Sequence, residues 1–486
     1  MKEVDWLLKG EPREVQMEAL RRSYPRRGYA HFLEMRLGKS SLLLAEFELF
    51  RRDHGFKWLV VLSPNSFKFE WCEEAIRWGS SVPAHAFDSS DKKTASKFVK
   101  DNAAQGGILV VNYESLIQAP IRDFVATVLG PQTMIAFDES IKIKNPQSAT
   151  TKACIALSKE CGARRVLTGK PVTQAPSDLW AQLRAIGELD GQNFFSFRNT
   201  YCRMGGFQGK KVIGSKNEEQ LQATMAPCAF IARRVDWMKT PGREYATRKL
   251  EMIHEQRVHY RSMEQDFLVW LGEGTEAITA DQIVSKLLKL QQISSGFIID
   301  EYGKPHDITP VTSNPKVQDL KSFLSEEVTG KLFVVVHYSH SLNLLEEALK
   351  EFNPAAIRGA AWHSKNERSV QDEKLKFNSD PSCRVLLGQE LACKYGHSII
   401  GAPDDPCLNM AYYENSFSLD DRAQTEERPQ GAAQQGLLTI WDYVCSPFEK
   451  MPILALQRKE DVSAAVLGYA RETGLLPHNW ENHNET

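Results

Sequence analysis

The sequence of 486 residues lacks an uninterrupted apolar run long enough to cross a bilayer. Its first residues, Met1 to Asp5, do not form the apolar core of a signal peptide. The nine cysteines are scattered, and none of them forms the C-x-x-C pair of a zinc knuckle. These absences predict a cytoplasmic protein with reduced thiols and no membrane partner.

The sequence also lacks an excess of charge of either sign. Lys and Arg number 60 against 62 Asp and Glu, so the formal net charge is -2. This balance excludes a histone-like polycation, but it permits a local basic groove, because nucleic-acid binding depends on where the charge lies. Basic pairs occur, each alone more typical of a solvated surface than of a phosphate contact, for example Arg21-Arg22, Arg26-Arg27, Lys210-Lys211 and Arg233-Arg234.

Short apolar runs rich in β-forming residues alternate with helix-like stretches, early in the chain and again late. Continuous runs of this kind predict parallel sheets covered by helices on both faces. Residues 176–295 between the two sets read as mainly helical, and a stretch with Pro and Gly at 302–315 reads as a hinge. The runs are residues 58–62, 108–111, 134–137, 165–167, 332–336, 385–387, 410–413 and 438–441.

The pattern therefore predicts an α/β protein of two lobes with helical insertions, since a chain of this length exceeds one ordinary core. We expect an N-terminal lobe with a first helical insertion at 1–240 and a helical insertion with the hinge at 241–310. A C-terminal lobe follows at 311–474, and a tail at 475–486.

A phosphate-binding motif is the first sign of chemistry. Arg36-Leu37-Gly38-Lys39-Ser40-Ser41 opens an apolar helix. Backbone N–H groups and the helix dipole at such a position face an anion, the Lys reaches the β- and γ-phosphates, and the Ser hydroxyl binds Mg²⁺. The full P-loop pattern has another Gly where this chain has Leu33, so a chance Gly-Lys-Ser explains the motif equally well when it is taken alone.

An acidic pair, Asp138-Glu139, directly follows the apolar run at 134–137. Ligands of open α/β sheets bind beyond the carboxyl ends of the strands, where an Asp binds Mg²⁺ and a neighbouring Glu orients and deprotonates water. An acidic pair at a helix N-terminus has the helix dipole as a simpler explanation. The pair and the phosphate motif together favour a nucleotide site more strongly than either does singly.

Several strings carry a family resemblance. Residues 138–145 are similar to D-E-[AS]-H-[RK]-[IL]-K-N, residues 167–171 to L-T-G-T-P, and residues 35–40 to M-G-L-G-K-[ST]. On these strings the chain resembles the SWI/SNF-type branch of helicase superfamily 2, the DNA-dependent ATPases that include chromatin remodellers and small bacterial and phage relatives. The similarity runs from about Pro12 to Leu467.

Further strings follow from this resemblance. Residues 12–16 look like the family's N-terminal glutamine motif, which implies that Gln16 reads adenine. Residues 62–64 with Trp71 resemble the motif that contacts a DNA strand. Residues 232–234 match the paired arginines that close the first insertion, and residues 424–428 resemble the start of Q-x-x-x-R-x-x-R.

Three departures from the family pattern bear on activity. Ile141 replaces the usual His, which predicts that a polar link between the ATP site and the lobe-coupling motif is missing. Lys170 replaces Thr in that coupling motif. Gly431 stands where the second arginine of Q-x-x-x-R-x-x-R belongs, so a slow ATPase is expected, with Arg422 as a candidate substitute.

The resemblance implies two RecA-like P-loop lobes and an ATP-dependent motor that acts on double-stranded or branched DNA, with ATP and Mg²⁺ as cofactors. It places nucleotide on residues 36–41 and Gln16, Mg²⁺ on Ser40 and Asp138, the general base on Glu139 and a transition-state arginine on Arg428. It further implies a monomeric motor in a bacterial cytoplasm or a phage-infected cell, with other DNA-processing proteins as partners.

Two alternatives stay open at this point. A degenerate ATPase would bind ATP and DNA as a regulated clamp without turnover, as the missing second arginine suggests. An unrelated P-loop motor of the DNA-packaging type would need a C-terminal nuclease carboxylate cluster, and residues 450–486 contain none.

Overall fold

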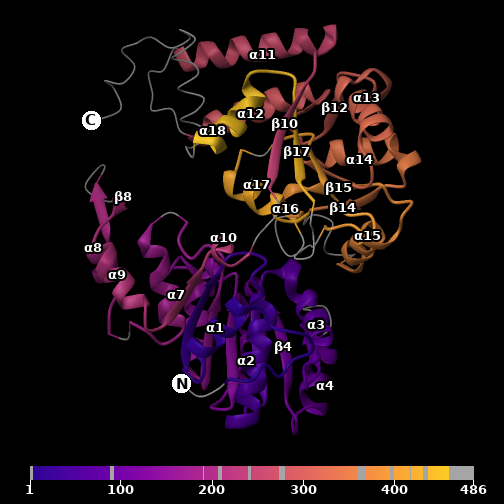
Figure 1. Ribbon diagram of the computed structural model, residues 1–486. Coiled ribbons are helices and arrows are strands. Elements are labelled where there is room, and N and C mark those ends of the chain that lie inside the picture. Colours follow the sequence, from indigo (N-terminus) through magenta and orange to yellow (C-terminus); the bar gives the residue numbers. More distant parts are fainter. Residues whose placement is uncertain are drawn as a thin grey trace. The chain divides into compact units, whose positions relative to one another are not determined.

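The computed structural model divides the chain into two compact units, Met1–Lys239 and Thr240–Thr486, which we call lobe 1 and lobe 2 and describe separately (Figure 1). Gly431 and the expected tail at 475–486 lie outside the described residues. No helix within the described ranges is both long enough and apolar enough to span a bilayer. The structure describes residues 4–87, 92–173, 175–189, 191–205, 211–238, 242–272, 280–359, 367–393, 399–415, 417–430 and 436–458.

Lobe 1 is built on a seven-stranded sheet in the order β3-β4-β2-β5-β6-β1-β9, and every neighbouring pair is parallel. The runs predicted at 58–62, 108–111, 134–137 and 165–167 are confirmed as strands of this sheet. The strands are β1 (Gly28–Leu33), β2 (Trp58–Ser63), β3 (Ala84–Ala86), β4 (Gly107–Asn112), β5 (Thr133–Asp138), β6 (Ala163–Leu167) and β9 (Ala229–Ala232).

Both faces of this sheet are buried, because successive side chains of a strand point to opposite faces. Val60 packs into one apolar core, whereas its neighbours Leu59 and Val61 pack into another. Helices supply the other half of each core. They are α1 (Glu14–Ser23), α2 (Lys39–His54), α3 (Lys68–Arg77), α4 (Lys92–Asp101), α5 (Ala119–Ala126), α6 (Ala149–Lys159) and α7 (Leu179–Ala185). Helices α4, α5, α6 and α7 pack into the core that contains Val60, and α1, α2 and α3 into the other.

An excursion between α7 and β9 corresponds to the first insertion. It contains α8 (Phe194–Tyr201), the hairpin of β7 (Cys202–Gly205) and β8 (Lys211–Ser215), and α9 (Glu218–Met225), which lie together in Figure 1. The chain then returns to the sheet as β9 and ends the lobe with α10 (Arg234–Trp237). The expectation of a mainly helical segment is therefore wrong for the hairpin and for β9.

Lobe 2 has a six-stranded parallel sheet in the order β10-β17-β16-β13-β15-β14. The predicted runs at 332–336, 385–387, 410–413 and 438–441 are confirmed as its strands. Alternate residues of β13 again enter different cores. The strands are β10 (Arg243–Lys249), β13 (Leu332–Val336), β14 (Ala355–Ile357), β15 (Val385–Gln389), β16 (Asn409–Tyr412) and β17 (Leu438–Val444).

The expectation of a helical insertion at 241–310 is wrong at its start, because β10 is an edge strand of the lobe 2 sheet. Its residues are only partly buried, as is usual for a strand at an edge. The hairpin of β11 (Phe297–Ile299) and β12 (Pro305–Asp307) encloses the start of the stretch that reads as a hinge. The helices of lobe 2 are α11 (His254–Gly272), α12 (Ala280–Ser294), α13 (Pro315–Ser322), α14 (Ser339–Ala348), α15 (Glu367–Ser379), α16 (Glu390–Cys393), α17 (Leu419–Glu426) and α18 (Met451–Arg458).

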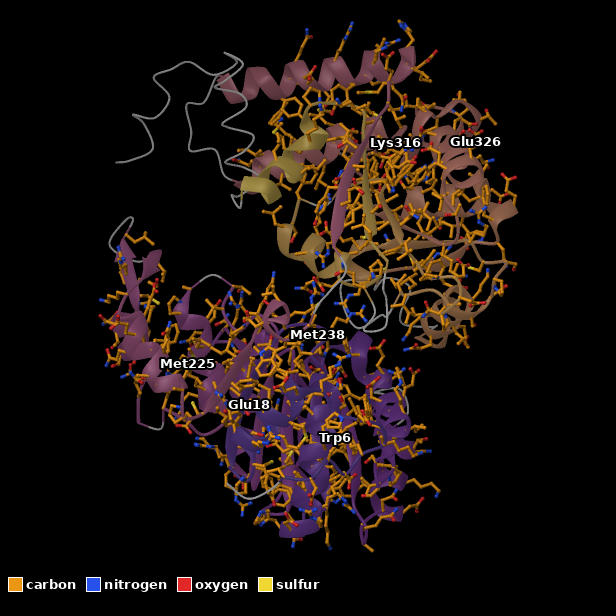
Figure 2. The ribbon with its side chains drawn as sticks, in the orientation of Figure 1. Trp6, Glu18, Met225, Met238, Lys316 and Glu326 are labelled. Atoms are coloured by element: carbon orange, nitrogen blue, oxygen red, sulfur yellow. The ribbon has the colours of Figure 1, made fainter. Side chains whose placement is uncertain are left out.

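A buried ion pair joins several of these elements inside lobe 2. Lys316, labelled in Figure 2, is fully buried at the start of α13. Its ammonium donates to the Glu449 carboxylate at 2.7 Å and to the Tyr413 carbonyl at 3.1 Å.

The two parallel sheets with helices on both faces confirm the predicted α/β fold of two P-loop-type lobes.

Candidate active site

The candidate site lies at the carboxyl edge of the lobe 1 sheet. Because the strands are parallel, the loops after β1, β2, β5 and β6 leave from the same edge. Asp138 pairs with Leu167 in register, and Thr168 follows directly. The phosphate motif after β1 and the acidic pair after β5 therefore belong to one region, although β6 separates their strands.

The phosphate motif forms a loop that ends at the N-terminus of α2. Gly38 is the N-cap of this helix, with a left-handed φ of 81°. Since Gly38 has no side chain to cap the helix, the first amides of α2 are available to an anion. Lys39 begins the helix, and its ammonium donates to the Leu33 carbonyl at 3.1 Å. This geometry suits a bound phosphate.

Two further features set the shape of the loop. Arg36 also has a left-handed φ, of 70°, which is a strained conformation for a residue with a Cβ. Leu37 is fully buried and anchors the loop in the core of the lobe. Ser40 follows Lys39 in the first turn of α2, where its side chain is half-buried.

Gln16 of α1 is in direct contact with this loop. Its amide nitrogen donates to the Gly38 carbonyl at 3.0 Å and to the Ser41 hydroxyl at 2.7 Å. Its amide oxygen accepts from the Arg13 backbone at 2.9 Å, and the side chain is only 2% exposed. In this structure Gln16 thus supports the phosphate loop, and adenine recognition stays a prediction.

Arg13 is a residue that the sequence did not single out. Its guanidinium donates to the Arg36 carbonyl and lies 3.5 Å from the Met238 sulfur, at the residue labelled in Figure 2. Gln16, three positions later, accepts the Arg13 amide, which is one half of a capping box. That spacing is the signal by which the start of α1 could have been found, but the contact with Arg36 spans 23 residues.

Asp138 is the last residue of β5 and is buried, with 6% exposure. One carboxylate oxygen accepts from the Trp71 indole at 2.9 Å and from the Ser63 hydroxyl at 3.5 Å, and the other accepts from the Glu139 backbone at 3.0 Å. Burial raises the pKa of this carboxyl to about 7, and the charge of Glu139 adds to the effect, whereas Trp71 and Lys39 oppose it.

Glu139 adopts a left-handed conformation with φ 48°, a strain of the kind that clusters at functional sites. Its carboxylate accepts a hydrogen bond from the Thr168 hydroxyl at 3.1 Å. Thr168 belongs to the string at 167–171 that resembles the coupling motif. A polar link between the acidic pair and that motif is therefore present, and the expectation that Ile141 removes it is wrong.

A second polar link runs parallel to the first. The Ser140 hydroxyl donates to the Gln182 amide oxygen at 2.7 Å, and the Gln182 amide nitrogen donates to the Pro171 carbonyl at 2.7 Å. Ser140 and Gln182 are both fully buried. The segment of the acidic pair and Ser140 is thus joined at two points to the loop that follows β6.

The oxygen donors of the site fit Mg²⁺. A hydroxyl at Ser40 and a carboxylate at Asp138 are hard ligands, and Mg²⁺ commonly takes one or two carboxylates and completes its shell with water and phosphate. In the described part of the chain no three His, Cys, Asp or Glu side chains gather so as to hold a metal by themselves. A metal at this position would therefore need nucleotide oxygens as well.

The arginine motif of lobe 2 lies on and after α17. Arg428 is 7% exposed, and its Nε donates to the Gln424 carbonyl at 3.1 Å. Arg422 is fully buried: it pairs with Asp442 at 2.7 Å and with Glu426 at 2.9 Å. The expectation that Arg422 substitutes for the missing arginine is wrong, because the lobe's own carboxylates hold its guanidinium.

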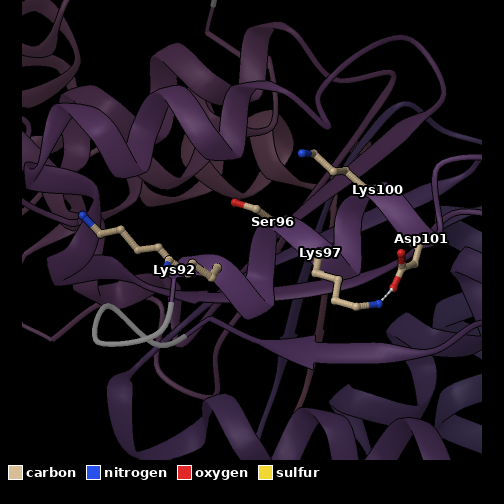
Figure 3. Close-up of a pocket in the computed structure, with 6 residues that line it drawn as sticks. Lys92, Ser96, Lys97, Lys100 and Asp101 are labelled. Carbon is tan, nitrogen blue, oxygen red and sulfur yellow. Dashed lines mark hydrogen bonds and ion pairs between the residues drawn. The ribbon is translucent and has the colours of Figure 1, made fainter.

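A row of lysines on α4 is another charged feature of lobe 1 (Figure 3). A surface hollow there is lined by side chains of that one helix, and Lys97 is paired with Asp101. A row of this kind is typical of a solvated helix face, and we assign it no ligand. The lining residues are Lys92, Lys93, Ser96, Lys97, Lys100 and Asp101.

Comparison with known families matches residues 15–296 to the SNF2-related domain. This match covers more than half of the chain, including the phosphate loop and the acidic pair. The chain belongs to the SNF2-related family. Membership places it among the DNA-dependent ATP hydrolases of helicase superfamily 2 and confirms the resemblance found in the sequence.

Individual relatives within this family are distant. Protein p41 of Acyrthosiphon pisum secondary endosymbiont phage 1 is 25% identical over 83% of this chain and 85% of its own length. The SWI/SNF-related matrix-associated actin-dependent regulator of chromatin subfamily A-like protein 1 of Xenopus laevis is 24% identical over 73% of this chain. The SNF2-related chain spans only 34% of that relative's length. The Sulfolobus solfataricus SWI2/SNF2 ATPase core in complex with dsDNA is 19% identical, covers 94% of this chain and 93% of its own, and has a TM-score of 0.43.

Proposed function

We propose that this SNF2-related protein is an ATP-dependent motor that translocates on double-stranded or branched DNA. One observation carries the proposal: the phosphate loop of α2 and the acidic pair after β5 lie at one sheet edge, and the pair is hydrogen-bonded to Thr168 in the loop after β6. That arrangement supports nucleotide hydrolysis linked to the coupling motif, and the family supports DNA as the polymer on which it acts.

The residues would divide the chemistry as follows. The α2 amides and Lys39 would bind the phosphates, Lys39 acting as the point charge on the β- and γ-phosphates. Ser40 and Asp138 would hold Mg²⁺, which when bound neutralises negative charge on the phosphate oxygens. Glu139 would orient the attacking water and accept its proton. The role of Arg428 in stabilising the transition state stays a prediction from the family pattern.

Duplex DNA is the proposed substrate because the relatives include proteins named for DNA repair, a DNA repair protein rad5 of Aspergillus fumigatus and the DNA repair and recombination protein RAD54B of Mus musculus. Contacts to backbone phosphates would give little sequence preference. They would also make DNA stimulation fall steeply with salt, since each neutralised phosphate releases counterions.

Phosphate release measured with duplex, forked and single-stranded DNA tests this proposal. We expect duplex or forked DNA to stimulate the rate, and we expect stimulation to fade between low and moderate salt. A chain that binds ATP and DNA but shows no turnover under any of these conditions would instead be the regulated clamp. Stimulation by single strands alone would contradict the choice of duplex DNA.

Two variants test the site itself. Lys39→Ala should abolish hydrolysis and weaken ATP binding, and Glu139→Gln should keep ATP affinity while stopping turnover. Lys159→Ala and Glu160→Gln are matched controls, because both residues are exposed at the end of α6. Parental turnover in either site variant would show that the nucleotide is hydrolysed elsewhere.

A further inference from the structure

The Asp138 carboxylate is held by donors from three segments of the chain. The Trp71 indole reaches it from α3, the Ser63 hydroxyl from the end of β2, and the Glu139 amide from the next residue along the chain. The indole contact is the shorter of the two side-chain contacts, 2.9 Å against 3.5 Å. Trp71 is 2% exposed, so water does not compete strongly for its N–H group.

We propose that Trp71 is a positioning residue for the Mg²⁺-binding carboxylate of Asp138. This inference rests on the proposed function, because it takes Asp138 as a metal ligand. The sequence had grouped Trp71 with the segment that resembles a DNA-strand motif, and the structure brings its indole to the nucleotide site instead.

The chemistry of the two groups explains this role. An indole N–H donates and never accepts, so it always presents hydrogen to the carboxylate. Each carboxylate oxygen has two acceptor positions, so the oxygen bonded to the Glu139 amide keeps a position for a cation, whereas the other oxygen accepts from both Trp71 and Ser63. The two bonds fix the plane of the carboxylate. Hydrogen-bond partners of metal ligands typically change metal affinity or activity by about 10- to 100-fold when removed.

The position of α3 gives this contact a second consequence. α3 begins shortly after Ser63 and Pro64, the residues that resemble the DNA-strand motif. Trp71 therefore ties a helix next to that segment to the carboxylate after β5. A shift of α3 on DNA binding would act on the metal ligand directly, without passing through the sheet.

A purely structural role is the competing explanation, since Trp71 also packs in the core that contains Val61 and Ala136. Trp71→Phe separates the two, because it keeps an aromatic ring and removes only the N–H donor. Trp78→Phe is the matched control. Trp78 follows the same helix, and its indole donates at 2.8 Å to Glu74, which lies on α3 itself.

The first measurement is binding of a fluorescent ATP analogue to the full chain as a function of Mg²⁺ concentration, in a Glu139→Gln background that stops turnover. We expect Trp71→Phe to raise the Mg²⁺ concentration for half-maximal binding by about 10- to 100-fold. Trp78→Phe should leave it within about twofold, as expected for an exchange outside the metal ligands' hydrogen bonds. Binding without metal should not change in either variant.

The outcomes distinguish a failure of the proposed function from a failure of the positioning role of Trp71. If the Glu139→Gln parent binds no nucleotide, the proposed function fails. If the parent binds normally and Trp71→Phe has an unchanged Mg²⁺ requirement, the proposed function stands and the positioning role is wrong. An equal loss of binding with and without Mg²⁺ would assign Trp71 to packing alone.

A second measurement does not depend on how well Trp71→Phe folds. The indole ¹⁵N–¹H resonance of Trp71 should shift in Asp138→Asn, which has nearly the same shape but lacks the negative charge, whereas the resonance of Trp78 should not. Addition of Mg²⁺ with nucleotide should move the same Trp71 resonance. A Trp71 resonance that is indifferent to Asp138→Asn would overturn the proposal.

Discussion

Gly38→Ala is the substitution for which the structure gives the sharpest expectation. Gly38 has a φ of 81°, a conformation that residues with a Cβ rarely adopt. An added Cβ would also lie 2.5 Å from the Gln16 amide nitrogen, far inside van der Waals contact. Both effects act on the loop that would bind phosphate, so the substitution should drive the loop out of its binding conformation.

The magnitude follows from the contacts. A left-handed residue with a Cβ costs about 1 to 2 kcal/mol. Displacing Gln16 removes its two hydrogen bonds to Gly38 and Ser41, at about 0.5 to 1.5 kcal/mol each. The total of about 2 to 5 kcal/mol corresponds to about 30-fold to several-thousand-fold weaker nucleotide binding, because binding must restore the original loop.

Equilibrium binding of a fluorescent ATP analogue measures this effect, and Gly55→Ala is the matched control. Gly55 caps the other end of α2 with a left-handed φ of 67°, but an added Cβ meets nothing nearer than 3.7 Å. Gly55→Ala should therefore leave binding nearly unchanged. Gln16→Ala with Gly38→Ala should lose less than the sum of the single losses, since the clash is gone. Parental affinity in Gly38→Ala would refute this account of the loop.

Two further predictions concern buried ion pairs. The Arg165 guanidinium lies 2.6 Å from the Glu46 carboxylate, and both side chains are fully buried. Glu46→Gln should destabilise lobe 1 by about 3 to 5 kcal/mol, because it leaves the buried guanidinium without a charged partner. Amide hydrogen exchange of α2, measured in the full chain in urea, gives the loss of stability. Burial disfavours the charged form of Glu46, but the charge of Arg165 outweighs burial and holds the pKa of Glu46 well below its usual value. The stabilisation of lobe 1 by this ion pair is therefore complete above the unfolded pKa of about 4.3 and disappears as the pH falls toward the folded pKa. The parent should show this acid-side loss, and Glu46→Gln should not. Arg422→Met should destabilise lobe 2 by about 3 to 5 kcal/mol, because Asp442 stays buried without its partner. Faster amide hydrogen exchange in β17 would show this loss. A slower hydrolysis rate with unchanged hydrogen exchange would instead restore Arg422 as the substitute for the missing arginine.

Several of the strands that sequence reasoning found have sequences that alone account for their burial. β2, β4, β5 and β13 are each built around a continuous apolar run and are buried along their whole length, as strands covered on both faces must be. β1 was missed, and its apolar run is interrupted by His31, which is fully buried against Glu46 of α2 at 3.1 Å. β6 was found from residues 165–167 although it carries Arg165, which is buried against the same Glu46. A polar residue whose partner lies on another element has no local signal of its burial.

Sequence reasoning found the candidate ligands of the site but not the residues that hold them in place. The chemistry of a Gly-Lys-Ser loop and of an acidic pair after a strand is local, and both could be found from short strings. Trp71 lies 67 residues from Asp138 along the chain, and no spacing rule joins an indole to a distant carboxylate. Sequence reasoning missed Arg13 and Gln182 for the same reason, since each contacts a residue that is distant along the chain.

The departures from the family strings acquire a different meaning once these contacts are known. Ile141 removes the residue that the family pattern offers for a polar link, yet Thr168 donates directly to Glu139 and Gln182 joins Ser140 to Pro171. Lys170 changes the coupling string beside Thr168 without removing that donor: the Thr168 hydroxyl also accepts from the Lys170 backbone at 3.3 Å. The Glu139 carboxylate is linked to the loop after β6 by the hydrogen bond from Thr168, and Ser140 is linked to that loop through Gln182. Substitutions within a family motif therefore do not by themselves indicate that the link between the acidic pair and the coupling motif is lost. The contacts made at each substituted position decide whether that link is kept.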